Sequence, residues 1–148
     1  MPKIEKITKQ TENPYVNLYL VEGKNKVDHL FRYYVASRAK TMEALKIKTK
    51  KNTPDGVLMY SLYGEKRDKI VLVRQYRVSI DDYIYEFPAG LVESGEEFHE
   101  AAVREMHEET GLTFHPLKVD PCYEKPFFTT IGMTDEACSA VYGWCEGE

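Results

Sequence analysis

The sequence predicts a mixed α/β (α+β) fold, with a mixed β-sheet sandwiched by helices and an added N-terminal antiparallel sheet. Two observations predict it. Tyrosine-rich stretches that alternate in character, or are apolar throughout, dominate the first half of the 148 residues, and such stretches are typical of strands. One strongly amphipathic stretch, near residues 94–111, has the periodicity of a helix. We therefore expect more strand than helix.

The N-terminal third is predicted to be β-structure. Residues 27–36 alternate with a period of two and carry bulky side chains on both faces. Leu45 and Ile47 stand between lysines and indicate a short strand with its lysines in solvent. Residues 52–56, Asn-Thr-Pro-Asp-Gly, form a turn signal. We accordingly expect one domain over residues 1–52 and a second over residues 53–148.

The second domain is predicted to begin with two strands, at residues 57–63 and 69–76, joined by a loop at 64–68. The run at residues 70–73 is apolar on both sides, which is typical of a central strand covered on two faces. Three prolines break up the stretch after the amphipathic segment, and residues 137–144 indicate one more strand.

The amphipathic stretch has signals for both ends of a helix. Ser94 and Glu97 have the spacing of a capping box, so the helix is expected to begin at Ser94. Gly111 is the expected glycine beyond its last turn. Apolar residues recur between these ends at a spacing of three to four: Phe98, Ala101, Ala102 and Met106.

Composition excludes several classes of protein. A formal charge of −4 argues against a nucleic-acid binder, which would normally carry a basic face. No apolar run approaches the roughly 18 residues of a membrane span. No apolar segment of a signal peptide follows the N-terminal charges, and three cysteines without CxxC spacing favour free thiols in a reducing compartment. We therefore expect a cytoplasmic protein.

Acidic side chains gather near the C-terminal end of the expected helix. Glu105, Glu108 and Glu109 fall within an arc of about 100° on one face. They repel one another, and the helix dipole disfavours anions at that end. Such a cluster is either a solvated surface or a site for a hard cation such as Mg²⁺ or Mn²⁺.

The spacing around the cluster resembles the signature of the Nudix hydrolases, G-x5-E-x7-R-E-U-x-E-E-x-G-U, where U is bulky and apolar. All nine specified positions between Gly90 and Leu112 match. The resemblance implies a Nudix fold and metal-dependent cleavage of a nucleoside diphosphate linked to another group. It covers, more loosely, residues from about 57 to 144.

The resemblance also implies roles for the residues of the signature. Glu105 and Glu109 would be the principal metal ligands, with Glu108 as a shared or second-metal ligand and the carbonyl of Ala89 completing the site. Arg104 would orient a glutamate. Gly90, Glu96 and Gly111 would be structural, with Glu96 holding the turn before the helix.

The segments Leu72–Arg77 and Tyr85–Gly90 resemble the ADP-ribose pyrophosphatase branch, in which a strand ending in Q-Y-R precedes E-x-P-A-G. This implies that Arg77 contacts the phosphates or the terminal ribose of the substrate. Glu86 would contact the adenine side or a metal-bound water. From the residues alone, a surface arginine at a strand end is the preferred interpretation of Arg77, and the resemblance reverses that preference.

Residues 130–136 resemble the S-P-G-x-S-x-E loop of this branch, with Ile131 in place of the proline. Gly132, Met133 and Glu136 are the substrate-binding candidates there, and Pro126 lies near the position of the marker proline of the branch. The resemblance further implies that the N-terminal strands form a homodimer.

Members of this branch continue beyond the position of Trp144 with a loop that carries an acidic general base, and then with a helix. The present sequence ends at Glu148, so we expect the C-terminal helix to be missing. Glu146 and Glu148 could replace the base, or the base could lie beyond residue 148.

Three interpretations stay open. The first is hydrolysis of ADP-ribose or a related ADP-sugar to AMP and a sugar phosphate. The second is hydrolysis of another nucleoside diphosphate derivative. The third is a truncated or inactive Nudix module that senses a nucleotide, although the intact acidic cluster favours an enzyme.

Overall fold

The computed structural model describes residues 2–148 and divides into two compact units. Unit 1 contains residues 1–53 and 128–136, and unit 2 contains residues 54–127 and 137–148. The division between residues 53 and 54 falls within the 52–56 turn. The segment 128–136 was expected in the second domain, but it belongs to the compact unit of the N-terminal strands.

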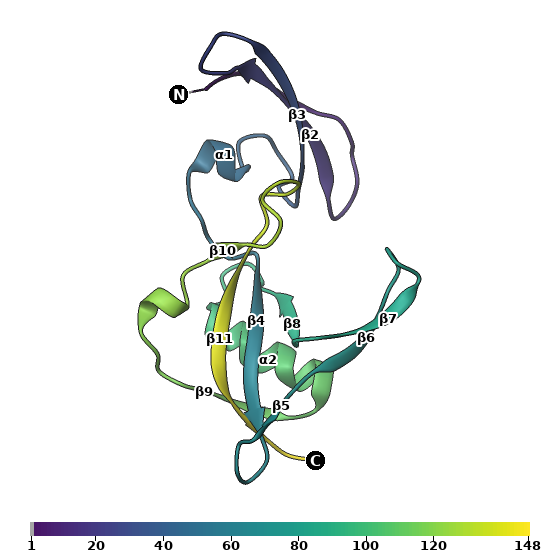
Figure 1. Cartoon of the computed structure of the whole chain (residues 1–148), viewed down its shortest axis with the longest axis vertical. Coiled ribbons are helices and arrows are strands. Elements are labelled where there is room, and N and C mark those ends of the chain that lie inside the picture. The colour runs from purple at the N-terminus through teal and green to yellow at the C-terminus, as the bar shows by residue number, and fades with distance from the viewer. Residues whose placement is uncertain (1) are drawn as a thin grey trace. The chain divides into compact units, whose positions relative to one another are not determined.

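Unit 1 is built on an antiparallel sheet in the order β1 (Lys3–Lys9), β2 (Asn17–Lys24) and β3 (Leu30–Ser37) (Figure 1). The predicted N-terminal antiparallel sheet is thus confirmed. The central strand β2 is the most buried, and Tyr19 is fully enclosed, with its hydroxyl donating to the carbonyl of Ala39 at 2.7 Å. The predicted strand at 27–36 starts late, because Asn25 organises a turn by accepting from the N–H groups of Val27 and His29.

A short helix, α1 (Lys46–Thr49), replaces the strand predicted around Leu45 and Ile47. That prediction was wrong. Leu45 precedes the helix and is 2% exposed, so this one side chain anchors the segment in the interior of unit 1. Residues 45–50 then close one helical turn through N–H to carbonyl bonds such as that from Lys50 to Lys46. Two apolar residues that alternate with lysines do not distinguish a strand from a helical turn in which only one of them, here Leu45, is buried.

Segment 128–136 joins unit 1 through its backbone and side chains. The N–H of Ala36 donates to the carbonyl of Met133 at 2.9 Å, and the hydroxyl of Tyr33 donates to the carbonyl of Gly132 at 2.5 Å. Arg38 pairs with Glu136 at 2.9 Å. These contacts tie the segment to β3.

Unit 2 contains a mixed sheet in the order β10 (Phe127–Phe128), β11 (Ala137–Glu146), β4 (Gly56–Tyr63) and β5 (Lys69–Ile70). The long strands β11 and β4 run parallel, with Val141 opposite Met59. Two further strands extend the sheet: β8 (Ala89–Leu91) pairs antiparallel with β4, and β9 (Thr113–Pro116) pairs antiparallel with β11. The mixed sheet of the predicted fold class is confirmed.

Helix α2 (Phe98–Thr110) packs across one face of this sheet (Figure 1). The predicted stripe lies inward: Ala101, Ala102 and Met106 are fully buried against Val57 and Met59. A 3-10 turn, η1 (Pro121–Tyr123), follows β9. Among residues 2–148 no second long helix is present, as the prolines predicted.

Helix α2 starts later than predicted. Glu97, not Ser94, is the N-cap residue, and its carboxylate accepts from the N–H of His99 at 2.8 Å. The predicted end is correct: Gly111 has a φ of 73° and donates its N–H to the carbonyl of His107. A left-handed conformation of this kind costs glycine little.

The predicted strand over residues 69–76 is interrupted. β5 stops at Ile70, and the chain then enters a separate antiparallel ribbon, β6 (Val73–Arg77) and β7 (Asp82–Glu86) (Figure 1). The prediction that residues 70–73 form a central strand was wrong. Val71 is buried in the core beneath α2, whereas Ile70 and Leu72 are exposed.

No helix within residues 2–148 has the length and apolar character needed to cross a membrane.

Candidate functional site

The short strand β8 and helix α2 approach so closely that their contact admits no side chain at Gly90. Gly90 pairs with Val57 of β4, and Glu105 of α2 lies directly against it. A Cβ atom at Gly90 would lie 1.9 Å from Cδ and 2.3 Å from Cγ of Glu105. The glycine at this position of the signature therefore has a steric cause: a residue without a side chain lets the Glu105 carboxylate rest on the backbone.

Arg104 is the centre of a network of carboxylates. Its Nε and Nη2 donate to the two oxygens of Glu96, both at 2.9 Å, and Nη2 also donates to the carbonyl of Leu91 at 3.0 Å. Its Nη1 donates to Glu105 at 2.9 Å and to Glu108 at 3.4 Å. The fork of the guanidinium thus joins the loop before α2 to the acidic face of the helix.

Charge pairing shifts the pKa values within this network. The hydrogen bonds from Arg104, followed by the bond from the N–H of Glu93, hold the pKa of Glu96 at about 2. The pKa of Arg104 is raised further by Glu96 and Glu105. Both groups are therefore ionised at neutral pH, and Glu96 secures the turn that leads into the helix.

Glu109 has a different environment. It accepts from the N–H of Ala89 at 3.2 Å. Its pKa is raised, chiefly by burial and then by the negative charges of Glu105 and Glu86, against the lowering effects of the Ala89 bond and Arg77. A carboxylate that its surroundings make costly to ionise is stabilised by an additional cation.

These side chains offer the ligands that a hard divalent cation prefers. Glu105 and Glu109 bring carboxylate oxygens close to the backbone at residues 89–90, where the Ala89 carbonyl is a further oxygen ligand. Within residues 2–148 no three acidic, histidine or cysteine side chains already converge on one point. The three carboxylates of α2 do not converge because each has another partner. Arg104 pairs with Glu105 and with Glu108, and the Glu108 side chain is 57% exposed. Glu109 accepts from the N–H of Ala89.

The β6–β7 ribbon contributes a cation to this site. Arg77 donates from Nε to Glu86 at 2.8 Å. The hydrogen bond to Glu86 is also the main reason that the pKa of Arg77 is raised, and the charge of Glu109 adds to it. Arg77 and Glu86, both selected from the sequence, therefore lie within electrostatic reach of Glu109.

A hollow of about 170 Å³ lies beside Glu109 and is lined also by Val73, Arg74 and Gln75 of β6. Gln75 is not among the site residues predicted from the sequence. A signal was available, because Gln75 is two positions from Arg77, and residues two apart on a strand share a face.

Three other predicted site residues lie in unit 1. Gly132 and Met133 bond to β3 through their carbonyls, and Glu136 pairs with Arg38 and accepts from Thr129 at 3.2 Å. The structure therefore brings Gly132, Met133 and Glu136 together with one another in unit 1, whereas the acidic cluster belongs to unit 2.

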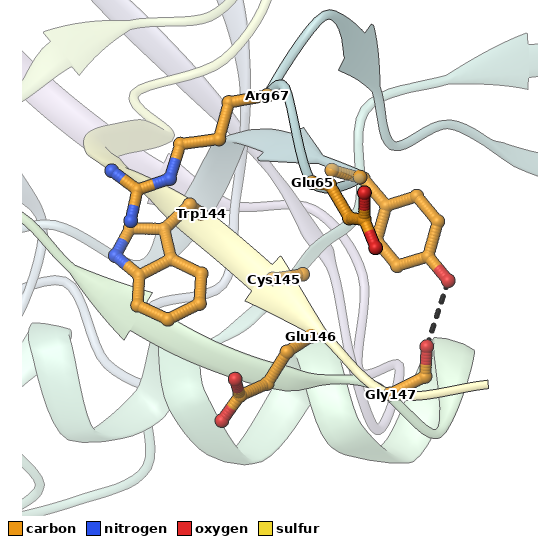
Figure 2. Close-up of a pocket in the computed structure, with 8 residues that line it drawn as sticks. Glu65, Arg67, Trp144, Cys145, Glu146 and Gly147 are labelled. Carbon is orange, nitrogen blue, oxygen red and sulfur yellow. Dashed lines mark hydrogen bonds between the residues drawn. The ribbon is translucent and has the colours of Figure 1, made fainter.

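Glu146, one of the two candidate replacements for a general base, lies beside a different hollow, of about 340 Å³, at the end of β11 (Figure 2). Glu146 lines it and pairs with His115 at 2.9 Å, and His115 in turn stacks on Trp144. Figure 2 shows the guanidinium of Arg67 over the Trp144 indole, 4.4 Å from the ring centre. The residues that line this hollow include none of the acidic residues of α2.

Residues 52–144 match the NUDIX domain family. ADP-ribose pyrophosphatase of Saccharomyces cerevisiae is 35% identical over 80 residues, which is 53% of this chain and 35% of that protein. ADP-ribose pyrophosphatase of Bacillus subtilis is 44% identical over 68 residues, 46% of this chain and 35% of that protein. ADP-sugar pyrophosphatase of Mus musculus is 36% identical over 87 residues, 57% of this chain and 40% of that protein. The matches thus span about a third of the length of these relatives.

A solved structure of an ADP compounds hydrolase superposes on 99% of this chain with a TM-score of 0.72 and 19% sequence identity. The superposed part is 69% of that chain. At this level of identity the likeness shows the fold, and it agrees with the predicted fold class.

Proposed function

The chain belongs to the NUDIX family, and from this premise we propose that it is a metal-dependent pyrophosphohydrolase that cleaves ADP-ribose or a related ADP-sugar to AMP and a sugar phosphate. Two relatives named ADP-ribose pyrophosphatase and one named ADP-sugar pyrophosphatase support this substrate class. So does the pair of segments with Q-Y-R and E-x-P-A-G, which resembles the ADP-ribose pyrophosphatase branch of the family.

One observation carries the proposal: two carboxylates of α2 meet the backbone of β8 beside a cation. Glu105 rests on Gly90, and Glu109 accepts from the N–H of Ala89 and interacts electrostatically with Arg77 and Glu86. A pyrophosphate brings negative charge to such a site and would be repelled by the acids alone. It therefore needs cations on both sides, one held by the carboxylates and one supplied by the ribbon.

We propose that Glu105 and Glu109, with Glu108 and the Ala89 carbonyl, hold Mg²⁺ or Mn²⁺. When bound, such an ion neutralises pyrophosphate oxygens and activates a water for attack on phosphorus. Arg104 orients Glu105 and Glu108 by donating hydrogen bonds to both from one guanidinium nitrogen. Gly90 keeps the space for Glu105, and Glu96 holds Arg104 from the opposite end.

Arg77 is the proposed phosphate-binding cation. Glu86 accepts from its Nε, so the two terminal nitrogens remain directed away from that bond and can donate to phosphate oxygens. Glu86 thus positions Arg77 in addition to its proposed contact with the adenine side or a water molecule.

We propose further that the protein is a cytoplasmic homodimer in which unit 1 contributes to substrate binding. Large exposed apolar side chains of unit 1 support an interface, among them Leu30 and Tyr34 of β3 and Met133 of segment 128–136, at 77%, 51% and 66% exposure. Gly132, Met133 and Glu136 lie in this unit and remain proposed substrate-binding residues.

The test is release of AMP from ADP-ribose, ADP-glucose, NADH and a dinucleoside polyphosphate in the presence of Mg²⁺ or Mn²⁺. ADP-ribose or ADP-glucose should be the best substrate, and chelation with EDTA should abolish turnover. Arg77→Ala should lower kcat/KM about ten- to a hundredfold, because a hydrogen bond to a charged group contributes roughly 1.5–3 kcal/mol. Preference for a nucleoside triphosphate would contradict the substrate assignment.

A further inference from the structure

One face of strand β6 is directed at the acidic site. β6 and β7 pair without a register shift, so Val73, Gln75 and Arg77 share a face. The other face is occupied by aromatic packing, since Tyr76 contacts Tyr83 at 5.3 Å between ring centres. Gln75 therefore belongs to the face that carries Arg77.

The position of Gln75 relative to the site follows from the hollow beside Glu109. Gln75 and Glu109 both line this space of about 170 Å³. Arg77, one step further along the same face, already interacts with Glu109 and with Glu86. Gln75 is exposed, and within residues 2–148 its carboxamide has no hydrogen-bond partner. Its two N–H donors and its oxygen are thus available to a ligand in the hollow.

The chemistry of an amide suits this position. A lysine or arginine at residue 75 would add a further cation to the hollow that Arg74 already lines, and a cation on that face can compete with a metal ion for Glu109. A glutamate there would add another negative charge to the hollow that Glu109 lines. A neutral carboxamide can donate to a phosphate oxygen without either effect.

We infer that Gln75 is a substrate-binding residue that donates a hydrogen bond to a pyrophosphate oxygen next to the contact made by Arg77. This inference rests on the proposed function, since it takes the substrate to be a nucleoside diphosphate linked to a sugar. Gln75 and Arg77 would together bind the phosphates from one face of β6, while the carboxylates of α2 face the same ligand from the helix.

The experiment compares full-length parent, Gln75→Ala and Gln75→Glu with ADP-ribose and Mn²⁺. Gln75→Ala should raise KM about tenfold with kcat nearly unchanged, because it removes a hydrogen bond to a charged group that holds substrate and transition state alike. Gln75→Glu keeps the shape and an acceptor oxygen but loses the donor and adds a negative charge. It should therefore raise KM more, on the order of a hundredfold.

Mn²⁺ affinity, measured by electron paramagnetic resonance without substrate, should be unchanged in Gln75→Ala, which separates a substrate contact from damage to the acidic cluster. Tyr76→Phe is the matched control. It also removes a hydrogen bond from β6, the one to Asp81, but on the opposite face of the ribbon, and its KM should equal that of the parent.

An unchanged KM in Gln75→Ala overturns the inference while leaving the proposed function intact. Normal turnover by Gln75→Glu also overturns it, because the retained acceptor would then be serving a sugar hydroxyl group. A parent protein that releases no AMP from ADP-ribose overturns the proposed function, and the inference with it.

Discussion

Gly90→Ala tests the contact that organises the site. The φ of Gly90 is not positive, so alanine meets no backbone penalty there. The whole effect comes from the added Cβ, which would lie 1.9 Å from Cδ, 2.3 Å from Cγ and 2.3 Å from Oε1 of Glu105. Because Cγ is included, rotation of the carboxylate tip alone cannot relieve the clash, and the Glu105 side chain must leave the β8 backbone.

The cost can be placed from the structure. The Glu105 side chain is 16% exposed and holds a 2.9 Å bond from Arg104. Forcing a side chain out of a packed position typically costs about 1–3 kcal/mol. Losing a hydrogen bond to a charged group costs a similar amount, about 1.5–3 kcal/mol. We expect Gly90→Ala to lower the free energy of unfolding by about 2–4 kcal/mol and to weaken Mn²⁺ binding by at least tenfold.

A double-mutant cycle isolates the cause. Urea unfolding is measured for Gly90→Ala, Glu105→Ala and the double variant, without divalent metal. In the Glu105→Ala background Cγ and Cδ are gone, so Gly90→Ala should then cost less than about 1 kcal/mol. If Gly90→Ala is equally destabilising in both backgrounds, the Glu105 contact is not the reason for glycine at this position.

Three further predictions concern the acidic network and the assembly. Glu109→Gln keeps the shape of the side chain and removes its charge, so Mn²⁺ affinity in isothermal titration should fall at least tenfold while thermal stability is retained; unchanged affinity would locate the metal elsewhere. The pKa of Glu96 is about 2 in the fold against 4.5 ordinarily, so its contribution to stability is present above pH 4.5 and is lost as the pH falls towards 2. Urea unfolding at a series of pH values should show this loss in the parent and a flatter profile in Glu96→Gln, and equal slopes would refute the pairing with Arg104. In sedimentation equilibrium the full chain should have twice the chain mass of 17.2 kDa, and a single-chain mass at micromolar concentration would rule out the homodimer.

Local patterns predicted the elements whose structure depends on their own residues. The stripe of Ala101, Ala102 and Met106 is buried as its spacing indicated, because a helix of fixed pitch allows only one face to reach the core. Gly111 ends the helix because the left-handed conformation there suits glycine. The spacing from Gly90 to Glu109 identified the acidic cluster for the same reason, since its three members, Glu105, Glu108 and Glu109, lie on one rigid helix.

Predictions failed where distant residues decide between local alternatives. Leu45 is held in the interior of unit 1, so the lysine-flanked segment after it coils into α1 instead of extending. Val71 is drawn into the core under α2, which breaks the apolar run at 70–73 into an edge strand and a separate ribbon. Glu97 replaces Ser94 as the N-cap residue. Its carboxylate accepts from the backbone N–H of His99 and contacts the His99 ring, and that ring also pairs with Glu124.

The sequence alone determined the family, the helix that carries the acids and the identity of the candidate ligands, because these depend on spacing within one segment. The tertiary structure decided which groups meet across segments. It set Glu105 against Gly90, placed Arg77, Glu86 and Gln75 of the ribbon beside Glu109, and assigned Gly132, Met133 and Glu136 to the unit of the N-terminal strands. These contacts depend on the register and packing of strands that are far apart in the chain, so no local periodicity in the sequence predicts them.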